Sequence, residues 1–159
     1  MSKNTKRFPR ILFAWLFAFA CAAGIFFLSS QNGEQSAMLS SGTMLPFARL
    51  MYALFGEAGH NVFRKFAHFF AYCLLMFFTY HAFYQTRTED RLSPFWPFTV
   101  CVLYACSDEL HQYSVPDRAC RLFDVGVDTL GCLVGGLCFY LVIRLIRYIQ
   151  SRKRKETKL

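Results

Sequence analysis

The chain has 159 residues and a formal net charge of +8, and 55% of its residues are hydrophobic and 18% aromatic. This composition excludes a disordered protein, because disordered segments are poor in hydrophobic and aromatic residues. It also disfavours a water-soluble enzyme, because the apolar residues gather in blocks long enough to cross a bilayer. We therefore predict an all-α, polytopic membrane protein with a single domain over residues 1–159.

Apolar stretches between clusters of charge predict four transmembrane helices. A spanning helix needs about 20 mostly apolar residues, and the first stretch contains no charged residue at all. A retained first span is favoured over a cleaved signal peptide, since further spans follow it. The predicted spans are residues 11–28, 66–84, 95–110 and 122–143.

The distribution of Lys and Arg predicts that both termini are cytoplasmic. The segments before the first span, between the second and third, and after the fourth hold 13 of the 18 basic residues, against five elsewhere. Cytoplasmic loops carry such an excess. The basic tail, residues 150–159, is interpreted as cytoplasmic and close to lipid headgroups, so the expected partners are membrane lipids and no nucleic acid.

The segment between the first two spans predicts a short amphipathic helix on the outer membrane surface. Its apolar residues recur at i, i+3, i+4, i+7 and i+8, which is one face of a helix. They are Phe47, Leu50, Met51, Leu54 and Phe55. Gly56 suits the end of this helix.

Ionisable residues in or beside the spans are costly and usually mark function. Here they gather at the outer ends of the second, third and fourth predicted spans. Because the topology brings these ends to one depth, we predict a polar pocket open to the outer leaflet. Ser29, Ser30 and Gln31, at the outer end of the first span, are expected to line it rather than only to cap the helix. The main members are Arg64, Lys65, His68, Asp108, Glu109, His111, Gln112, Arg118, Arg121, Asp124 and Asp128.

The charges of this pocket leave the question of a metal open. Lys65 and Arg118 fall two positive charges short of the four carboxylates, and either two further arginines or one divalent cation would restore the balance. No metal site is assigned and the cofactor is unknown. The alternative is a Mg²⁺, Mn²⁺ or Zn²⁺ site. Its ligands would be Asp108, His111, Asp124 and Asp128.

A structural interpretation competes with the functional one. Buried charges in membranes pair with each other, so Lys65 with Asp124, or Arg118 with Asp128, would simply hold helices together. For the whole set this interpretation is weaker, since helix packing rarely needs so many ionisable groups at one level. Small residues such as Gly131 and Gly135 already permit close helix contact.

Four motifs carry a resemblance to a known family: Ser29-Ser30-Gln31, Arg64-Lys65-x-x-His68, Ser107-Asp108-Glu109-x-His111-Gln112, and Pro116-x-Arg118 followed by Asp124-x-x-x-Asp128-Thr129-x-Gly131. The chain resembles the VanZ-like family from its first span to its fourth. The resemblance implies a bacterial multi-pass membrane protein, and the founding member is associated with resistance to the glycopeptide teicoplanin. One departure is Ala71, where members often carry Glu before the Tyr that follows, here Tyr72.

The first functional hypothesis is an enzyme that acts at the outer leaflet on a lipid-linked component of the cell envelope. Acid–base or metal-assisted chemistry would use catalytic residues among the carboxylates and imidazoles of the pocket. Cations and amides would bind a phosphate or carboxylate of the substrate. The catalytic candidates are His68, Asp108, Glu109 and His111, and the binding candidates are Gln31, Lys65, Gln112, Arg118, Asp124 and Asp128.

The second hypothesis is a non-catalytic protein that binds or shields an envelope lipid or an amphiphilic glycopeptide. It needs the same cations and aromatic walls, but no group poised for proton transfer. A transporter ranks third, because polar residues near the bilayer centre are expected of one. The central parts of the first, third and fourth predicted spans are mostly apolar.

Overall fold

The computed structural model describes residues 7–31, 53–54, 56–86, 92–115 and 122–156. Its helices are α1 (Arg7–Ser29), α4 (Glu57–Thr86), α5 (Phe95–Tyr113) and α6 (Leu122–Glu156). The described part of the chain contains no strand. The prediction of an all-α fold is confirmed, and each of the four predicted spans lies within one of these helices.

Three of the helical segments are long and apolar enough to cross a membrane: Arg7–Ser29, Val62–Thr86 and Leu122–Glu156. The membrane character of the protein rests on them. α5 does not belong to this group, because polar residues such as Asp108, Glu109 and Gln112 occupy its last turns. That α5 also crosses the bilayer, and that both termini are cytoplasmic, remain predictions.

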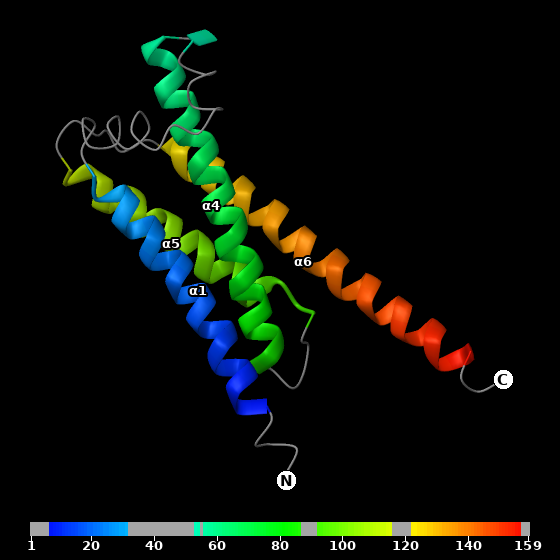
Figure 1. Cartoon of the computed structure of the whole chain (residues 1–159). Coiled ribbons are helices and arrows are strands. Elements are labelled where there is room, and N and C mark those ends of the chain that lie inside the picture. The colour runs from blue at the N-terminus through cyan, green and yellow to red at the C-terminus, as the bar shows by residue number, and fades with distance from the viewer. Residues whose placement is uncertain (1–6, 32–52, 55, 87–91, 116–121, 157–159) are drawn as a thin grey trace.

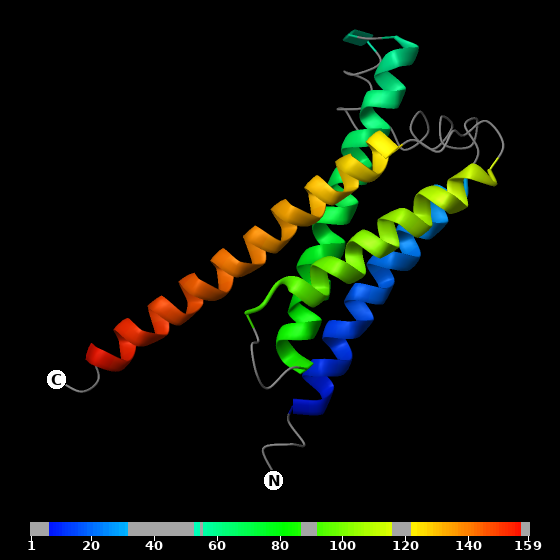
Figure 2. The same cartoon turned by 180° about the vertical axis from the view of Figure 1, so that it is seen from behind.

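α4 is the central helix of the bundle. α1 and α5 run alongside each other, and α6 crosses α4 near one end of the bundle and then diverges from the other helices (Figures 1 and 2). The most extensive contacts of α4 are with α6 and then with α1. The beginning of α1 and the end of α6 both lie at the end of the bundle away from that crossing (Figure 1).

The apolar core is built around one face of α4. Tyr72, Leu75, Met76 and Tyr80 of that helix are almost completely buried. They pack against side chains from all three other helices. These are Ile25 of α1, Cys101 and Ala105 of α5, and Cys132 and Phe139 of α6. The outer faces of the helices expose many large apolar residues, as expected where lipid replaces water as the solvent.

The crossing of α4 and α6 depends on two glycines. A Cβ atom on Gly131 would collide with the backbone carbonyl of Phe69, and one on Gly135 with the carbonyl of Cys73. The two helix backbones are therefore in direct contact, as the G-x-x-x-G spacing predicted. This contact fixes where the start of α6 lies against the start of α4.

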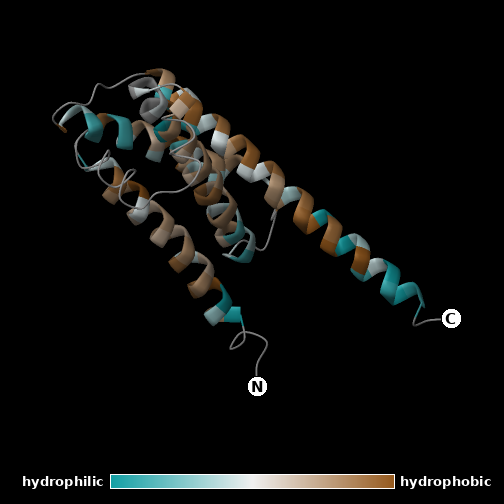
Figure 3. Cartoon of the chain, turned by 45° about the horizontal axis from the view of Figure 1, so that its top comes forward, coloured by the Kyte–Doolittle hydropathy of each residue, from teal (hydrophilic) through white to brown (hydrophobic). Residues whose placement is uncertain are grey.

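The helices are longer than the apolar blocks that predicted them. α4 begins at Glu57 rather than near residue 66, and α6 continues to Glu156 through most of the predicted basic tail, residues 150–159. A hydropathy pattern marks only the part of a helix that suits hydrocarbon. Lys, Arg, Gln and Glu are strong helix formers, so the helix continues into the polar region. The polar end of α6 is visible in Figure 3.

Most of the predicted surface helix over residues 47–56 lies outside the described residues, but residues 53–54 are described and are helical. Gly56 is described, and it has a positive φ of 58° immediately before α4. Glycine adopts this left-handed conformation without the steric cost that other residues pay. The position is consistent with Gly56 separating α4 from the segment before it.

Candidate functional site

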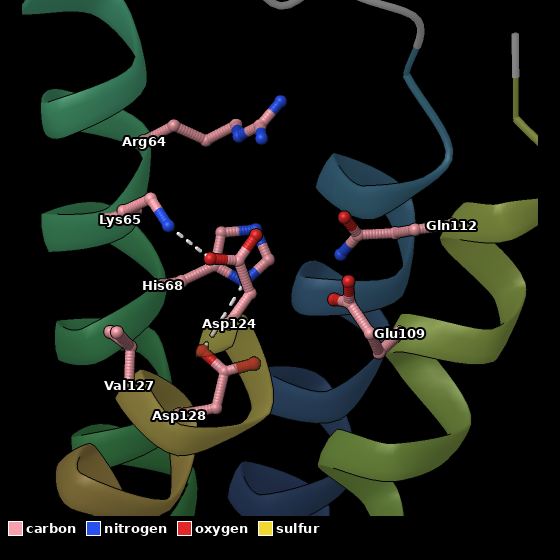
Figure 4. A pocket seen from close by; sticks show the side chains of 8 residues that line it. All are labelled: Arg64, Lys65, His68, Glu109, Gln112, Asp124, Val127 and Asp128. Atoms are coloured by element: carbon pink, nitrogen blue, oxygen red, sulfur yellow. Dashed lines mark hydrogen bonds and ion pairs between the residues drawn. The ribbon is translucent and has the colours of Figure 1, made fainter. Parts of the chain in front are cut away.

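A polar cleft lies at the end of the bundle where α4 and α6 cross. It has an empty volume of about 250 Å³, which includes its opening to solvent. α4, α5 and α6 all contribute side chains to it (Figure 4). The lining residues are Arg64, Lys65, His68, Glu109, Gln112, Asp124, Val127 and Asp128.

Helical spacing explains why these side chains face the same space. Arg64 and His68 are four residues apart on α4, Asp124 and Asp128 are four apart on α6, and Glu109 is three residues before Gln112 on α5. Residues at i, i+3 and i+4 lie on one face of a helix. Three polar helix faces therefore meet where the helices converge.

The α4–α6 wall of the cleft consists of paired charges. Lys65 Nζ donates a hydrogen bond to Asp124 Oδ1 and also lies 4.4 Å from the centre of the Phe123 ring. One turn deeper, His68 Nδ1 lies 3.6 Å from Asp128 Oδ1. The Lys65 and Asp124 side chains are 29% and 18% exposed, whereas Asp128 is almost fully buried. The side chains of this wall thus become less exposed to solvent with depth.

The α1–α5 wall is a buried hydrogen-bond network around one carboxylate. Ser29 Oγ donates to Asp108 Oδ2 at 2.8 Å, and Gln112 Nε2 donates to the same oxygen at 3.1 Å. Gln112 Nε2 also lies 3.3 Å from Ser29 Oγ. Nearer the middle of the bundle, the Tyr104 hydroxyl donates to the Ala22 carbonyl at 2.7 Å and joins α5 to α1. Asp108 is therefore held by donors from both helices.

Three buried oxygens have no hydrogen-bond partner among the described residues, and we call this group the floor of the cleft, although only Asp128 is one of the lining residues. They are Asp108 Oδ1, Asp128 Oδ1 and the Tyr72 hydroxyl. Buried polar groups are normally hydrogen-bonded, so this concentration of oxygens without a hydrogen bond needs an explanation, even though His68 Nδ1 lies 3.6 Å from Asp128 Oδ1.

The structure brings together most of the predicted site residues. Lys65, His68, Glu109, Gln112, Asp124 and Asp128 line the cleft, and Asp108 lies beside it in contact with Gln112. These residues come from three helices, as the topology predicted.

Two predicted residues are placed elsewhere. His111 packs against α1, where its ring stacks on Phe26 at 4.6 Å and its Nε2 lies 3.1 Å from Ser30 Oγ. Gln31 follows the end of α1 and does not line the cleft. Arg118 and Arg121 lie outside the described residues.

Other cleft residues were given no role by the sequence. Arg64 belonged to the polar set but received no assignment, although its spacing to His68 placed it on the same face. Val127 carries no polar signal. Ser29, by contrast, was expected to line the pocket together with Ser30 and Gln31, and it lies beside the cleft, bonded to Asp108. Tyr72 carried no signal, because a tyrosine inside an apolar span is common.

A metal would find a different set of ligands from the one predicted as an alternative. Donor atoms of His68, Asp108 and Asp128 lie within 4.8 Å of one another. Asp124 is instead paired with Lys65, and His111 is directed at α1. The four-residue alternative of Asp108, His111, Asp124 and Asp128 therefore does not match the observed grouping.

The helices and the cleft define a helical membrane protein with a polar site at one end of its bundle. A family model described as VanZ/LLP1 matches residues 13–144, which is most of the chain. The chain belongs to the VanZ/LLP1 family, and the resemblance inferred from its motifs is confirmed. No curated protein and no solved structure matches it significantly.

Proposed function

We propose that the protein binds the anionic headgroup of a lipid-linked envelope component in the cleft and acts on it there by acid–base chemistry. The observation that carries the proposal is the meeting of cations and proton-transfer groups in one opening, with Arg64 and Lys65 on α4 and Glu109 on α5. The beginning of α1 and the end of α6, which lead to the two termini, lie at the end of the bundle opposite the cleft (Figure 1). With the termini cytoplasmic, the cleft opens toward the outer leaflet.

Arg64 is the best candidate for anion recognition. No ion pair involves Arg64 within the part of the chain that the structure describes, whereas the charge of Lys65 is compensated by Asp124. In Figure 4 the Arg64 side chain extends across the opening of the cleft. A guanidinium binds phosphate or carboxylate through two parallel hydrogen bonds. Arg118, a predicted binding residue, is a second candidate by sequence.

Glu109 and His68 are the best candidates for proton transfer. Glu109 reaches the cleft from α5 and His68 reaches it from α4, so a headgroup between the helices would meet both (Figure 4). A general acid or base must come within hydrogen-bonding distance of the proton it moves. His111 does not line the cleft, and one oxygen of Asp108 is already engaged by Ser29 and Gln112.

Headgroup binding is tested with the full chain in nanodiscs of neutral lipid that contain a polyprenyl phosphate. We expect Arg64→Gln to weaken binding about tenfold or more, as for loss of a charge-assisted contact. Arg147→Gln is the matched control, because Arg147 contacts Tyr84 near the opposite end of the bundle. Inorganic phosphate added as a competitor distinguishes recognition of the phosphate from recognition of the lipid. Equal binding by both variants would refute the proposed anion site.

Turnover separates the enzyme from the binding or shielding protein. We expect Glu109→Gln to retain binding and to slow headgroup conversion, measured by mass spectrometry of the lipid, about 10²- to 10⁴-fold. The family association with glycopeptides adds a cellular readout, the susceptibility to teicoplanin. Cells that carry Glu109→Gln or His68→Gln are expected to lose resistance to teicoplanin if the protein is an enzyme. If these cells stay as resistant as cells with the unmodified chain, and the unmodified chain itself converts no lipid, the shielding function stands and the enzyme is excluded.

A further inference from the structure

The floor of the cleft has the composition and geometry of a cation site. We propose that His68, Asp108 and Asp128 bind one divalent transition-metal cation, Zn²⁺ or Mn²⁺. This inference rests on the same cleft as the proposed function and deepens it, because with the ion bound His68 serves as a ligand and proton transfer falls to Glu109. Its test measures occupancy by the ion alone, so it can succeed or fail independently of any headgroup.

The separation of the donor atoms is close to what an ion requires. One donor atom from each residue lies within 4.8 Å of the others, and His68 Nδ1 and Asp128 Oδ1 are 3.6 Å apart. Imidazole nitrogens and carboxylate oxygens bind Zn²⁺ at about 2.0–2.2 Å. Two ligands of one ion are therefore about 4 Å apart or less. Small side-chain rotations would close the remaining gap.

The unpaired oxygens supply an independent reason for a ligand. Asp108 and Asp128 are only 3% and 1% exposed, and each has one oxygen without a hydrogen-bond partner among the described residues. An ionised carboxylate in a dry environment is costly unless it is paired or coordinates a metal. A cation between the two carboxylates would satisfy both. The Tyr72 hydroxyl, fully buried and also unpaired, would then have a metal-bound water or a ligand oxygen to bond.

The arrangement around Asp108 resembles the support that metal ligands receive. Ser29 and Gln112 both donate to Oδ2, which orients the carboxylate and leaves Oδ1 available. Ligating carboxylates are typically held by such outer hydrogen bonds. The His68 ring lies roughly parallel to the Tyr72 ring, with an interplanar angle of 19° and centres 6.4 Å apart. Both donors thus have neighbours that restrict their orientation.

Charge favours a divalent ion. Among the described residues, neither Arg64 nor Lys65 forms an ion pair with Asp108 or Asp128. The Lys65–Asp124 pair is neutral by itself and lies nearer the solvent. At the floor, two carboxylates face a histidine that is uncharged when it acts as a metal ligand. One divalent cation would neutralise this floor.

The donor set narrows the choice of ion. Ca²⁺ takes six to eight oxygen ligands, and Mg²⁺ binds mainly through oxygens and water. An imidazole together with two carboxylates suits Zn²⁺ or Mn²⁺ better. Three protein ligands also leave a coordination position for water or a substrate oxygen, which is typical of catalytic rather than structural metal sites.

Binding is tested on the full chain, purified in detergent and stripped with a chelator. We expect one Zn²⁺ per chain by isothermal titration calorimetry, and one Mn²⁺ per chain by loss of the free-ion signal in electron paramagnetic resonance. Each of the isosteric variants Asp108→Asn and Asp128→Asn, and His68→Gln, should weaken binding more than about tenfold. Ser29→Ala should weaken ion binding about 10- to 100-fold, as is usual when a hydrogen bond that orients a metal ligand is removed.

Matched histidine controls identify the site. His111→Gln and His81→Gln should bind the ion as the unmodified chain does, because His111 packs on Phe26 and His81 pairs with Gln85. The ion should also raise the thermal unfolding temperature of the unmodified chain and not that of Asp128→Asn. This second readout detects a variant that folds but no longer binds.

Three outcomes would overturn the proposal. One is an unmodified chain that binds no stoichiometric ion. A second is binding that all three ligand variants retain. The third is binding that His111→Gln abolishes while His68→Gln does not. If Arg64→Gln and Arg147→Gln bind the headgroup equally, the proposed anion site is refuted while the measured occupancy by the ion is unaffected, so the two proposals are separated.

Discussion

The two walls of the cleft hold carboxylates in different ways. On the α4–α6 wall, Asp124 is partly exposed and forms an ion pair with Lys65. On the α1–α5 wall, Asp108 is buried and bound by the neutral donors Ser29 and Gln112. The first arrangement balances charge, and the second fixes orientation without balancing charge. The second leaves a buried carboxylate that no cation of the described residues pairs with, whereas the buried Asp128 of the first wall has His68 beside it.

The two walls differ because their carboxylates lie at different depths in the cleft and have different partner residues. Lys65 and Asp124 lie near the opening, where water can hydrate what the pair does not satisfy, and such pairs contribute little to stability. Asp108 lies deeper, where each lost hydrogen bond leaves an unsatisfied group. The wall with no formal cation is therefore the more sensitive to substitution.

Separating α4 from α6 should have the largest effect. Gly135→Leu places a side chain against the Cys73 carbonyl, and backbone atoms cannot move aside as a flexible side chain would. We expect a loss of about 3 kcal/mol or more in the free energy of unfolding, measured by thermal or denaturant unfolding in detergent. Gly126→Leu on the same helix is the control, since a Cβ atom at that position would meet no other atom within 4 Å. Equal losses in both variants would contradict the direct backbone contact.

The α1–α5 wall is tested by Ser29→Ala. This change removes a buried donor to Asp108 and should cost about 1.5–3 kcal/mol, the usual range for hydrogen bonds to charged groups. The loss should not depend on salt, because the contact is buried. Ser30→Ala, one residue away and exposed, should change the stability by less than about 0.5 kcal/mol. A similar loss in the two variants would mean that burial does not distinguish the walls.

The α4–α6 wall is tested by Lys65→Met, which keeps most of the apolar stem and removes the charge. We expect a loss of about 1 kcal/mol at low salt, because both partners of the pair are partly exposed. The difference from the unmodified chain should shrink in about 1 M salt, where the Debye length falls to about 3 Å. A large effect that salt does not reduce would place this pair in a drier environment than the structure indicates.

The smallest effect is expected from His111→Gln. His111 stacks on Phe26 and contacts Ser30 outside the cleft, so stability should change by about 0.5 kcal/mol or less. Headgroup binding and conversion should be unchanged in the nanodisc assay. Loss of conversion with normal stability would restore His111 to the catalytic role that its position in the motif suggested.

The sequence predicted the helices and the meeting of their polar ends for separate physical reasons. Apolar blocks mark segments that need hydrocarbon, so α1, α4 and α6 were readily found. The convergence of Lys65, His68, Glu109 and Asp124 followed from topology and helical spacing.

Which partner each group takes was harder to predict. Asp108 and His111 are three residues apart and share a helix face in the sequence pattern, yet one bonds Ser29 and the other packs on Phe26. Which partner each side chain meets depends on how α1 packs against α5, and the spacing of residues along one helix does not predict that packing. The polar end of α6 was also missed, because hydropathy does not record helix propensity in polar residues.

The length of α6 has a consequence for measurement. The helix is continuous from Asp124 to Lys155 and contacts α4 closely at Gly131 and Gly135. Lys155 is 27 residues beyond Asp128, or about 40 Å at 1.5 Å per residue. A small tilt of this rod about its crossing point moves its distant end much farther than its near end. A spin label at position 155 would thus report events at Asp128 without touching the cleft.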